Sequence, residues 1–217
     1  MTFRDLWLTL NATQIVLRDS NRTEQIHVVE ETTGRRAFRR VLERLRATDE
    51  GSELLRLRPE LSSTQVDYDE LRKLPPHTLG GAYVRHLDEN GLSAELQASL
   101  TKYVDDPDIA YLMRRFRQTH DVWHPLTTLG VQAYQEVIIH AFSYGQLRLP
   151  VSAMIVSLGG IKHGVLERRW SMLTHAMPAA YRSGARAADL IGVHWEAMWD
   201  RPIDQVRARY RITPIPA

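Results

Sequence analysis

Residues 105–136, DDPDIAYLMRRFRQTHDVWHPLTTLGVQAYQE, decide the fold of this chain. Asp106 and Pro107 are typical of a helix start, because an aspartate side chain accepts hydrogen bonds from free backbone N–H groups and proline suits the first turn. Beyond them, five side chains recur at steps of four, four, three and four residues: Ile109, Met113, Phe116, His120 and His124. Side chains at these steps share one face of a helix. The pattern predicts a helix that runs to about His124 and points both histidines inward.

The residues after this helix predict a turn and a second helix. Pro125 and Gly130 indicate a kink or break, and helical periodicity resumes over residues 128–147. Glu136 lies twelve positions after His124. On one straight helix that is about 120° round and about 18 Å along the axis. The carboxylate can therefore meet the histidines only if the second helix folds back on the first.

Four side chains with metal-binding donors form the candidate site: His120, Asp121, His124 and Glu136. Two imidazoles one helical turn apart can bind one metal ion, and buried imidazoles need a partner. Asp121 is about 100° round from His120. It therefore either approaches the ion or pairs with Arg117 on the surface. His140, one turn after Glu136, either orients that carboxylate or has no special task.

The whole chain has the composition of a globular protein, with 217 residues, 43% apolar and 25% charged. We expect one domain over residues 1–217, with residues 1–19 as an N-terminal extension. The absence of cysteine excludes disulfides, thiolate ligands and cysteine nucleophiles, and fits a reducing compartment. A net charge of only +2 gives no reason to expect a nucleic-acid partner.

The remaining segments also predict helices, at residues 35–46, 52–57, 79–89, 93–104, 179–198 and 204–211. Gly51 is expected to interrupt the chain before the second of these. Residues 151–170 are ambiguous, with a turn expected at Gly159 and Gly160. A weak strand pair is predicted at residues 15–17 and 26–29. The fold class is all-α: a single-domain helical bundle with a metal site between two adjacent helices.

Several segments resemble the ubiquinone (coenzyme Q) biosynthesis protein 4 family. The most specific is His120-Asp121-x-x-His124, followed after eleven residues by Glu136. The others are residues 74–83 (LPPHTLGGAY), 88–91 (DENG), 105–111, 114–120, 194–196 (HWE) and 202–207 (PIDQVR). The similarity covers about residues 20–213. Pro125 departs from the family pattern, in which an aliphatic residue is expected at that position.

The resemblance implies an all-helical protein of ubiquinone assembly, with a metal at His120, Asp121, His124 and Glu136. Family members are described as zinc proteins that associate peripherally with membranes and bind a polyprenyl chain in an apolar channel. They are described both as an organiser of the biosynthetic enzymes and as a lyase-type catalyst that replaces the ring C1 carboxyl with a hydroxyl. The implied partners are a prenylated quinone precursor or other isoprenoid lipid, a membrane surface and other ubiquinone-biosynthesis proteins.

The sequence has no recognisable signal peptide, mitochondrial presequence or spanning segment of about 18 apolar residues. We therefore expect a bacterial-type member that is cytoplasmic and peripherally associated with the inner face of the membrane. The tryptophan and methionine content near the C-terminus suggests a homodimer.

The donor set suits a catalytic metal better than a closed structural one, because it leaves a position open. We expect zinc ahead of iron(II) or magnesium; zinc would polarise a carbonyl or activate water, whereas iron(II) would handle O₂. One alternative is a non-enzymatic prenyl-lipid-binding scaffold with a structural metal. Another is a zinc-dependent hydrolase that uses Asp121 as general base. A third is a helical domain with buried histidines and no metal.

Three further groups of residues have two interpretations each. Three arginines either bind an anionic head group or simply face solvent: Arg114, Arg115 and Arg117. Five apolar residues either line a prenyl tunnel or belong to an ordinary core: Leu112, Met113, Phe116, Ile138 and Phe142. Three tryptophans either lie at a membrane surface or are buried in the protein: Trp123, Trp195 and Trp199.

Overall fold

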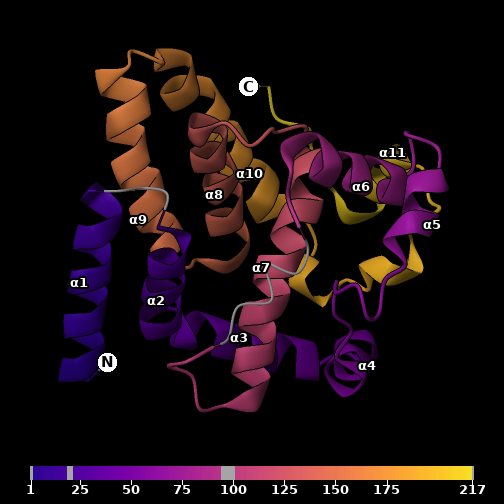
Figure 1. Ribbon diagram of the computed structural model, residues 1–217, viewed down its shortest axis with the longest axis horizontal. Coiled ribbons are helices and arrows are strands. Elements are labelled where there is room, and N and C mark those ends of the chain that lie inside the picture. Colours follow the sequence, from indigo (N-terminus) through magenta and orange to yellow (C-terminus); the bar gives the residue numbers. More distant parts are fainter. Residues whose placement is uncertain (1, 19–21, 94–100, 217) are drawn as a thin grey trace.

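Helix α7 (Pro107–Thr127) runs through the middle of the molecule and carries both motif histidines (Figure 1). The computed structural model describes residues 2–18, 22–93 and 101–216. The predicted helix start is confirmed, because the Asp106 carboxylate accepts hydrogen bonds from the backbone N–H groups of Asp108 and Ile109, at 3.0 and 3.2 Å. Pro107 occupies the first turn.

The predicted break at Pro125 is wrong, because α7 continues through it to Thr127. Helix ends leave carbonyl groups without an intrahelical donor. Here the Arg207 guanidinium donates to the carbonyl oxygens of Pro125 and Leu126, at 2.8 and 3.0 Å. The helix is then closed by Thr128, whose φ of 64° is left-handed. A distant arginine thus satisfies the last turn that the proline was expected to disrupt.

Helix α8 (Ala133–Leu147) begins five residues later than predicted and ends as predicted, before Pro150. Residues 128–132 form the connection that was expected to be helical. The chain reverses there, so α8 lies beside α7 (Figure 1). This arrangement confirms the expected return of the second helix and brings its first turn to the end of α7.

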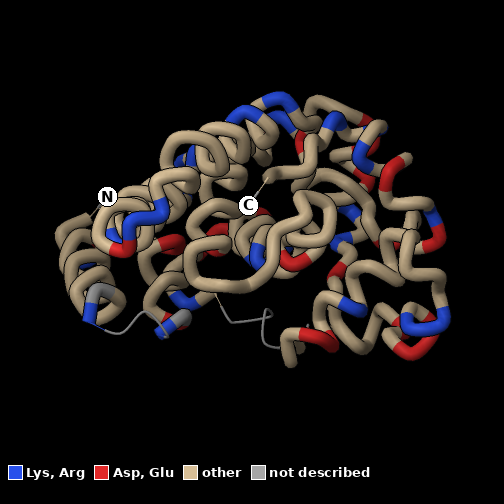
Figure 2. Tube along the Cα trace, turned by 90° about the horizontal axis from the view of Figure 1, so that it is seen from above, with Lys and Arg blue, Asp and Glu red and all other residues tan. Residues whose placement is uncertain are grey.

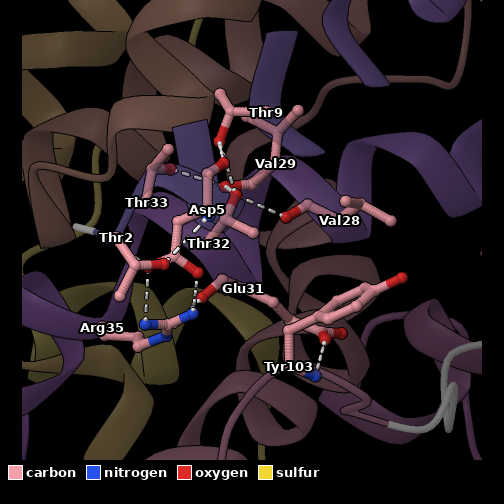
Figure 3. Close-up of polar contacts among 10 residues, drawn as sticks. All are labelled: Thr2, Asp5, Thr9, Val28, Val29, Glu31, Thr32, Thr33, Arg35 and Tyr103. Carbon is pink, nitrogen blue, oxygen red and sulfur yellow. Dashed lines mark hydrogen bonds and ion pairs between the residues drawn. The ribbon is translucent and has the colours of Figure 1, made fainter. Parts of the chain in front are cut away.

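The N-terminal region is helical, so the weak strand pair is wrong. Residues 15–17 belong to α1 (Phe3–Arg18) and residues 26–29 to α2 (Thr23–Thr33). The two helices pack side by side through polar contacts shown in Figure 3. The hydroxyls of Thr9 and Thr32 are 2.8 Å apart, and Arg35 donates to both carboxylate oxygens of Asp5, at 2.7 and 3.2 Å.

The next four helices are α3 (Arg35–Arg46), α4 (Asp49–Leu57), α5 (Tyr68–Lys73) and α6 (Leu79–Asn90). The predictions for α3 and α6 are confirmed, with four buried apolar side chains along α3: Phe38, Val41, Leu42 and Leu45. Helix α6 ends at Gly91, whose φ of 62° favours glycine. Gly51 does not interrupt the chain but lies inside α4. A Cβ there would be 2.3 Å from the carbonyl oxygen of Leu45, so glycine permits close packing.

The C-terminal third departs most from prediction. Gly159 and Gly160 do not form a turn; α9 (Pro150–Gly159) passes directly into a π-helix, η2 (Gly160–Leu166). A second π-helical segment, η3 (Met172–Ala176), leads into α10 (Met177–Arg186). The helix predicted over residues 179–198 stops at Arg186. Short 3₁₀ turns follow, η4 (Leu190–Gly192) and η5 (Trp195–Ala197), before the confirmed last helix, α11 (Ile203–Tyr210).

The all-α prediction is confirmed for the described residues, whose regular elements are all helical. The helix predicted over residues 93–104 falls largely on residues 94–100, outside that part of the chain. Helices α1, α2 and α9 flank α7 and α8 on one side, and α4, α5, α6 and α11 lie on the other (Figure 1). Acidic and basic residues are interspersed along the trace (Figure 2). Among the helices described, none combines the length and apolarity needed to cross a membrane.

Candidate metal centre

His120 and His124 lie one turn apart on the inward face of α7, as predicted. Their Nε2 atoms are 3.3 Å apart, and the His124 side chain is almost completely buried. His124 Nδ1 is 3.2 Å from the carbonyl oxygen of Leu129. Because a carbonyl oxygen only accepts, Nδ1 must carry the hydrogen in that bond. The Nε2 lone pair of neutral His124 is therefore directed toward His120.

Glu136, in the first turn of α8, completes a compact group with the two histidines. Its Oε2 is 3.5 Å from His120 Nε2, and its Oε1 is 3.5 Å from His124 Nε2. Ligands at 2.0–2.1 Å from a tetrahedral zinc ion are separated by about 3.3–3.4 Å. The three donor groups thus have nearly the mutual spacing that such an ion requires.

The protonation states of this group follow from burial and from the Glu136 carboxylate. Burial lowers the pKa of His124 to about 3, and the neighbouring His120 lowers it further. Burial is the largest influence on His120 and acts to lower its pKa, but the hydrogen bond and charge of Glu136, together with the charges of Asp121 and Glu30, raise the pKa overall. Burial alone would raise the pKa of Glu136, whereas the imidazoles lower it below its usual range. The shifts of His120 and Glu136 therefore both favour the charged forms of the pair.

Asp121 lies on a neighbouring side of α7 and is buried, with 5% of its surface exposed. It belongs to a second group of donor atoms within 4.8 Å of one another, formed by His86, Asp121 and His124. The alternative prediction, that Asp121 pairs with Arg117 on the protein surface, is wrong because Asp121 is not at the surface. Arg117 is also buried, and its guanidinium donates to Glu30 and Glu31 of α2, at 3.0 and 2.9 Å.

His86 is a site residue that the sequence analysis missed. It lies on α6, with 9% of its surface exposed, and its ring stacks on that of His124 with centroids 4.8 Å apart. Its position three residues after buried Tyr83 puts it on the inward face of the predicted helix. The three-residue step from Tyr83 to His86 could have predicted from the sequence that His86 points inward.

His140 does stand close to the centre, with its ring centroid 5.4 Å from that of His120. Its Nδ1 is 3.3 Å from the hydroxyl oxygen of Ser152 on α9. Burial lowers the pKa of His140 to about 3. A neutral second-helix histidine thus borders the site beside Glu136.

Arg115 is fully buried, so its assignment to a solvated helix face is wrong. Its guanidinium donates to both carboxylate oxygens of Glu196 and to the carbonyl oxygens of Pro59 and Val193. It therefore ties η5 to α7. Arg114 is more exposed and lies 3.6 Å from the Glu60 carboxylate.

The apolar residues considered for a prenyl tunnel are all buried in one continuous core: Leu112, Met113, Phe116, Ile138 and Phe142. The tryptophans do not mark a membrane surface. Trp123 and Trp195 are fully buried, and half-buried Trp199 stacks on Tyr83 at 5.5 Å. Most of the large apolar side chains that are exposed lie elsewhere, on α1 and on residues 161–170; the others are Leu57 and Tyr181.

The sequence is similar over nearly its whole length to known proteins. Residues 1–216 match the sequence model of the family described as coenzyme Q (ubiquinone) biosynthesis protein Coq4. The mitochondrial ubiquinone biosynthesis protein COQ4 of Coprinopsis cinerea is 29% identical over 210 residues, which are 97% of this chain and 72% of that protein. The mitochondrial COQ4 homolog of Bos taurus is 30% identical over 209 residues, which are 96% of this chain and 78% of that protein.

A solved structure shares the fold. The crystal structure of a proposed ubiquinone biosynthesis protein from Nostoc punctiforme superposes with a TM-score of 0.73. The match covers 95% of each chain, with 23% sequence identity. At that identity, the likeness concerns the architecture alone.

Proposed function

Because this chain belongs to the coenzyme Q (ubiquinone) biosynthesis protein Coq4 family, we propose that it acts in ubiquinone biosynthesis as a metalloprotein that binds a prenylated aromatic ring precursor. The family assignment supports the pathway. The proposal of a metal site is supported by the grouping of His120, His124 and Glu136, whose donor atoms are 3.3–3.5 Å apart. We expect zinc ahead of iron(II).

The chain's own residues prepare the site for such an ion. The Leu129 carbonyl fixes the His124 tautomer, so that Nε2 is the available donor. The return of α8 supplies Glu136, whose negative charge would offset half the charge of a divalent cation. Asp121 is a further buried carboxylate within 4.8 Å of a donor atom of His124, which supports a role as a ligand or as a residue that orients the ligands. When bound, the ion would supply Lewis-acid polarisation of a ring carboxylate or carbonyl.

The proposed reaction replaces the C1 carboxyl of the prenylated ring with a hydroxyl. The bond between the ring and the carboxyl carbon breaks and that carbon leaves as CO₂, while water supplies the new hydroxyl oxygen. O₂ takes up the two electrons and two protons that are released and leaves as hydrogen peroxide. Zinc is not redox-active, so with zinc the O₂ would react with the electron-rich ring itself. With iron(II), the ion would take part in the oxygen chemistry.

An exposed apolar stripe on α1 supports the proposed contact with a membrane surface. Its side chains recur at steps of three, one and three residues: Phe3, Leu6, Trp7 and Leu10, with exposed fractions of 86, 44, 60 and 62%. This spacing puts them on one face of the helix, as in helices that lie in a lipid interface. The relatives named above are mitochondrial by name. Attachment to a bacterial inner membrane stays a prediction for this chain.

Elemental analysis of protein purified without chelators tests the metal. We expect about one equivalent of zinc or iron in the wild type and none in His124→Ala. His175→Ala, which changes an exposed histidine, is the control and should retain the metal. Wild-type protein without a stoichiometric metal would overturn the proposal.

A second assay separates catalyst from scaffold. Metal-loaded protein is incubated under air with a prenylated hydroxybenzoic acid, and the loss of CO₂ is followed by mass spectrometry. Turnover that disappears in Glu136→Gln would support the catalyst. Tight binding of the acid without turnover, with either zinc or iron(II), would support a prenyl-lipid-binding scaffold instead.

A further inference from the structure

We infer that His86 is a third imidazole ligand of the metal ion, reaching it from α6. The inference rests on the proposed metal centre and deepens it. It raises the number of imidazole ligands from two to three, and the third ligand comes from a third helix, α6.

The surroundings of His86 call for a partner. Its Nε2 has less than 1 Å² of accessible surface and no hydrogen-bond partner among the described residues. A buried polar nitrogen without a partner destabilises the folded protein, so such groups in native structures usually have a specific role. The ring is stacked on that of His124 with the two planes 19° apart. One nitrogen of His86 lies within 4.8 Å of a donor atom of Asp121 and of His124.

Two groups of donors meet at His124. His120, His124 and Glu136 form one, and His86, Asp121 and His124 form the other, each with donor atoms within 4.8 Å of one another. Ligand atoms on a tetrahedral zinc ion are about 3.3–3.4 Å apart. The donor atoms of the second group lie within 4.8 Å of one another, so they would have to move closer by at most about 1.5 Å to bind one ion.

Both groups must serve the same ion. His124 uses Nδ1–H for its hydrogen bond to Leu129, which leaves one lone pair, on Nε2. A neutral imidazole with one lone pair binds one metal ion. Two separate ions sharing His124 would require the loss of the Leu129 bond. A single ion between α6, α7 and α8 keeps the bond between His124 and Leu129.

Three imidazoles narrow the class of metal. Imidazole suits zinc, iron, cobalt, nickel and copper, whereas magnesium and calcium prefer carboxylate, carbonyl and water oxygens. The inferred donor set therefore disfavours magnesium. It also leaves fewer positions on the ion for a substrate, so a ring carboxylate would have to bind through the remaining open position or displace Asp121.

Zinc affinity in competition with a chromophoric chelator tests the inference. The variants are His86→Gln and the matched control His77→Gln, which changes an exposed histidine just before α6. Loss of an outer partner of a metal site typically costs 10–100-fold in affinity. We expect His86→Gln to weaken zinc binding at least tenfold and His77→Gln to match the wild type.

X-ray absorption spectroscopy of the zinc-loaded wild type counts imidazoles directly and does not depend on a variant that folds. Three imidazoles would support the inference. Two imidazoles, or wild-type affinity in His86→Gln, would overturn it while leaving the proposed centre intact. Wild-type protein that binds neither zinc nor cobalt(II) would overturn both, so the two failures are distinguishable.

Discussion

The ring of His124 is anchored to the carbonyl oxygen of Leu129, 3.2 Å from Nδ1, just beyond the end of the helix that carries the ring. The left-handed Thr128 turns the chain so that this carbonyl faces back toward the histidine. One local turn therefore determines both the tautomer of His124 and the direction in which its lone pair points.

Glu136→Gln should lower the pKa of His120 in the metal-free protein. Burial already acts to lower that pKa, and the Glu136 carboxylate is what raises it. With the charge removed, burial should bring the value below the ordinary one of about 6.5. Titration of the histidine resonances by NMR measures this directly, with exposed His175 as the internal reference. An unchanged midpoint for His120 would contradict the assigned ion pair.

Arg115→Met should destabilise the fold by about 3–5 kcal/mol, because it leaves the Glu196 carboxylate and two carbonyl oxygens without their donor. Arg114→Met removes a longer and more exposed pair and should cost at most about 1 kcal/mol. Urea unfolding followed by circular dichroism gives both values. An equal loss of unfolding free energy in the two variants would contradict a larger contribution from the buried salt bridge.

The ion pair between Asp5 and Arg35 should make stability depend on acid pH. The hydrogen bonds from Arg35 and Thr2 hold the pKa of Asp5 well below its usual range. A carboxyl group whose folded pKa is depressed contributes its full stability above its unfolded pKa, about 3.9, and loses it as pH falls toward the folded pKa. The difference in unfolding free energy between wild type and Asp5→Asn should therefore be largest above about pH 5 and shrink below pH 4.

Arg35→Gln, which removes the other partner, serves as the control for that experiment. It should show the same decline in its difference from wild type as the pH falls. A difference that stays constant from pH 7 to pH 3 for both variants would contradict the ion pair.

Trp7→Glu should weaken binding to anionic lipid vesicles by about tenfold or more, because it replaces a large apolar side chain with a charge. Ser52→Glu adds the same charge at an exposed position of α4, away from the apolar stripe, and should bind nearly as the wild type does. Vesicle sedimentation measures the bound fraction. Equal losses in the two variants would show that charge alone, rather than the stripe, controls the interaction.

The parts of the fold that could be predicted are those set by local chemistry. Asp106 and Pro107 start α7 through backbone groups within three residues of them. The inward direction of His120 and His124 follows from helical spacing, and the place of Glu136 follows from geometry once a turn is assumed. The sequence and the family resemblance predicted a group of four, His120, Asp121, His124 and Glu136; the structure groups Glu136 with the two histidines and puts Asp121 in a second group with His86 and His124.

The parts that could not be predicted depend on partners distant in sequence. The last turn of α7, which includes Pro125, has its open carbonyl groups satisfied by Arg207, about eighty residues further along the chain. Arg115 is buried because Glu196 meets it, and nothing near Arg115 in the sequence indicates that partner. His86 joins the site only through the packing of α6 against α7. Periodicity shows that a side chain is inward, but not which one it will face.

The end of α7 has consequences for the order in which the protein is built. Three consecutive carbonyl oxygens there, of Pro125, Leu126 and Thr127, accept hydrogen bonds from Arg207 and from the backbone N–H of Ile215. A ribosome makes those donors about eighty residues after the helix itself. During synthesis, the carbonyl oxygens at the end of α7, close to His124, therefore lack these hydrogen-bond donors until Arg207 and Ile215 have been made. The candidate metal site therefore lies on a segment whose last turn depends on Arg207 and Ile215, which are made about eighty residues later.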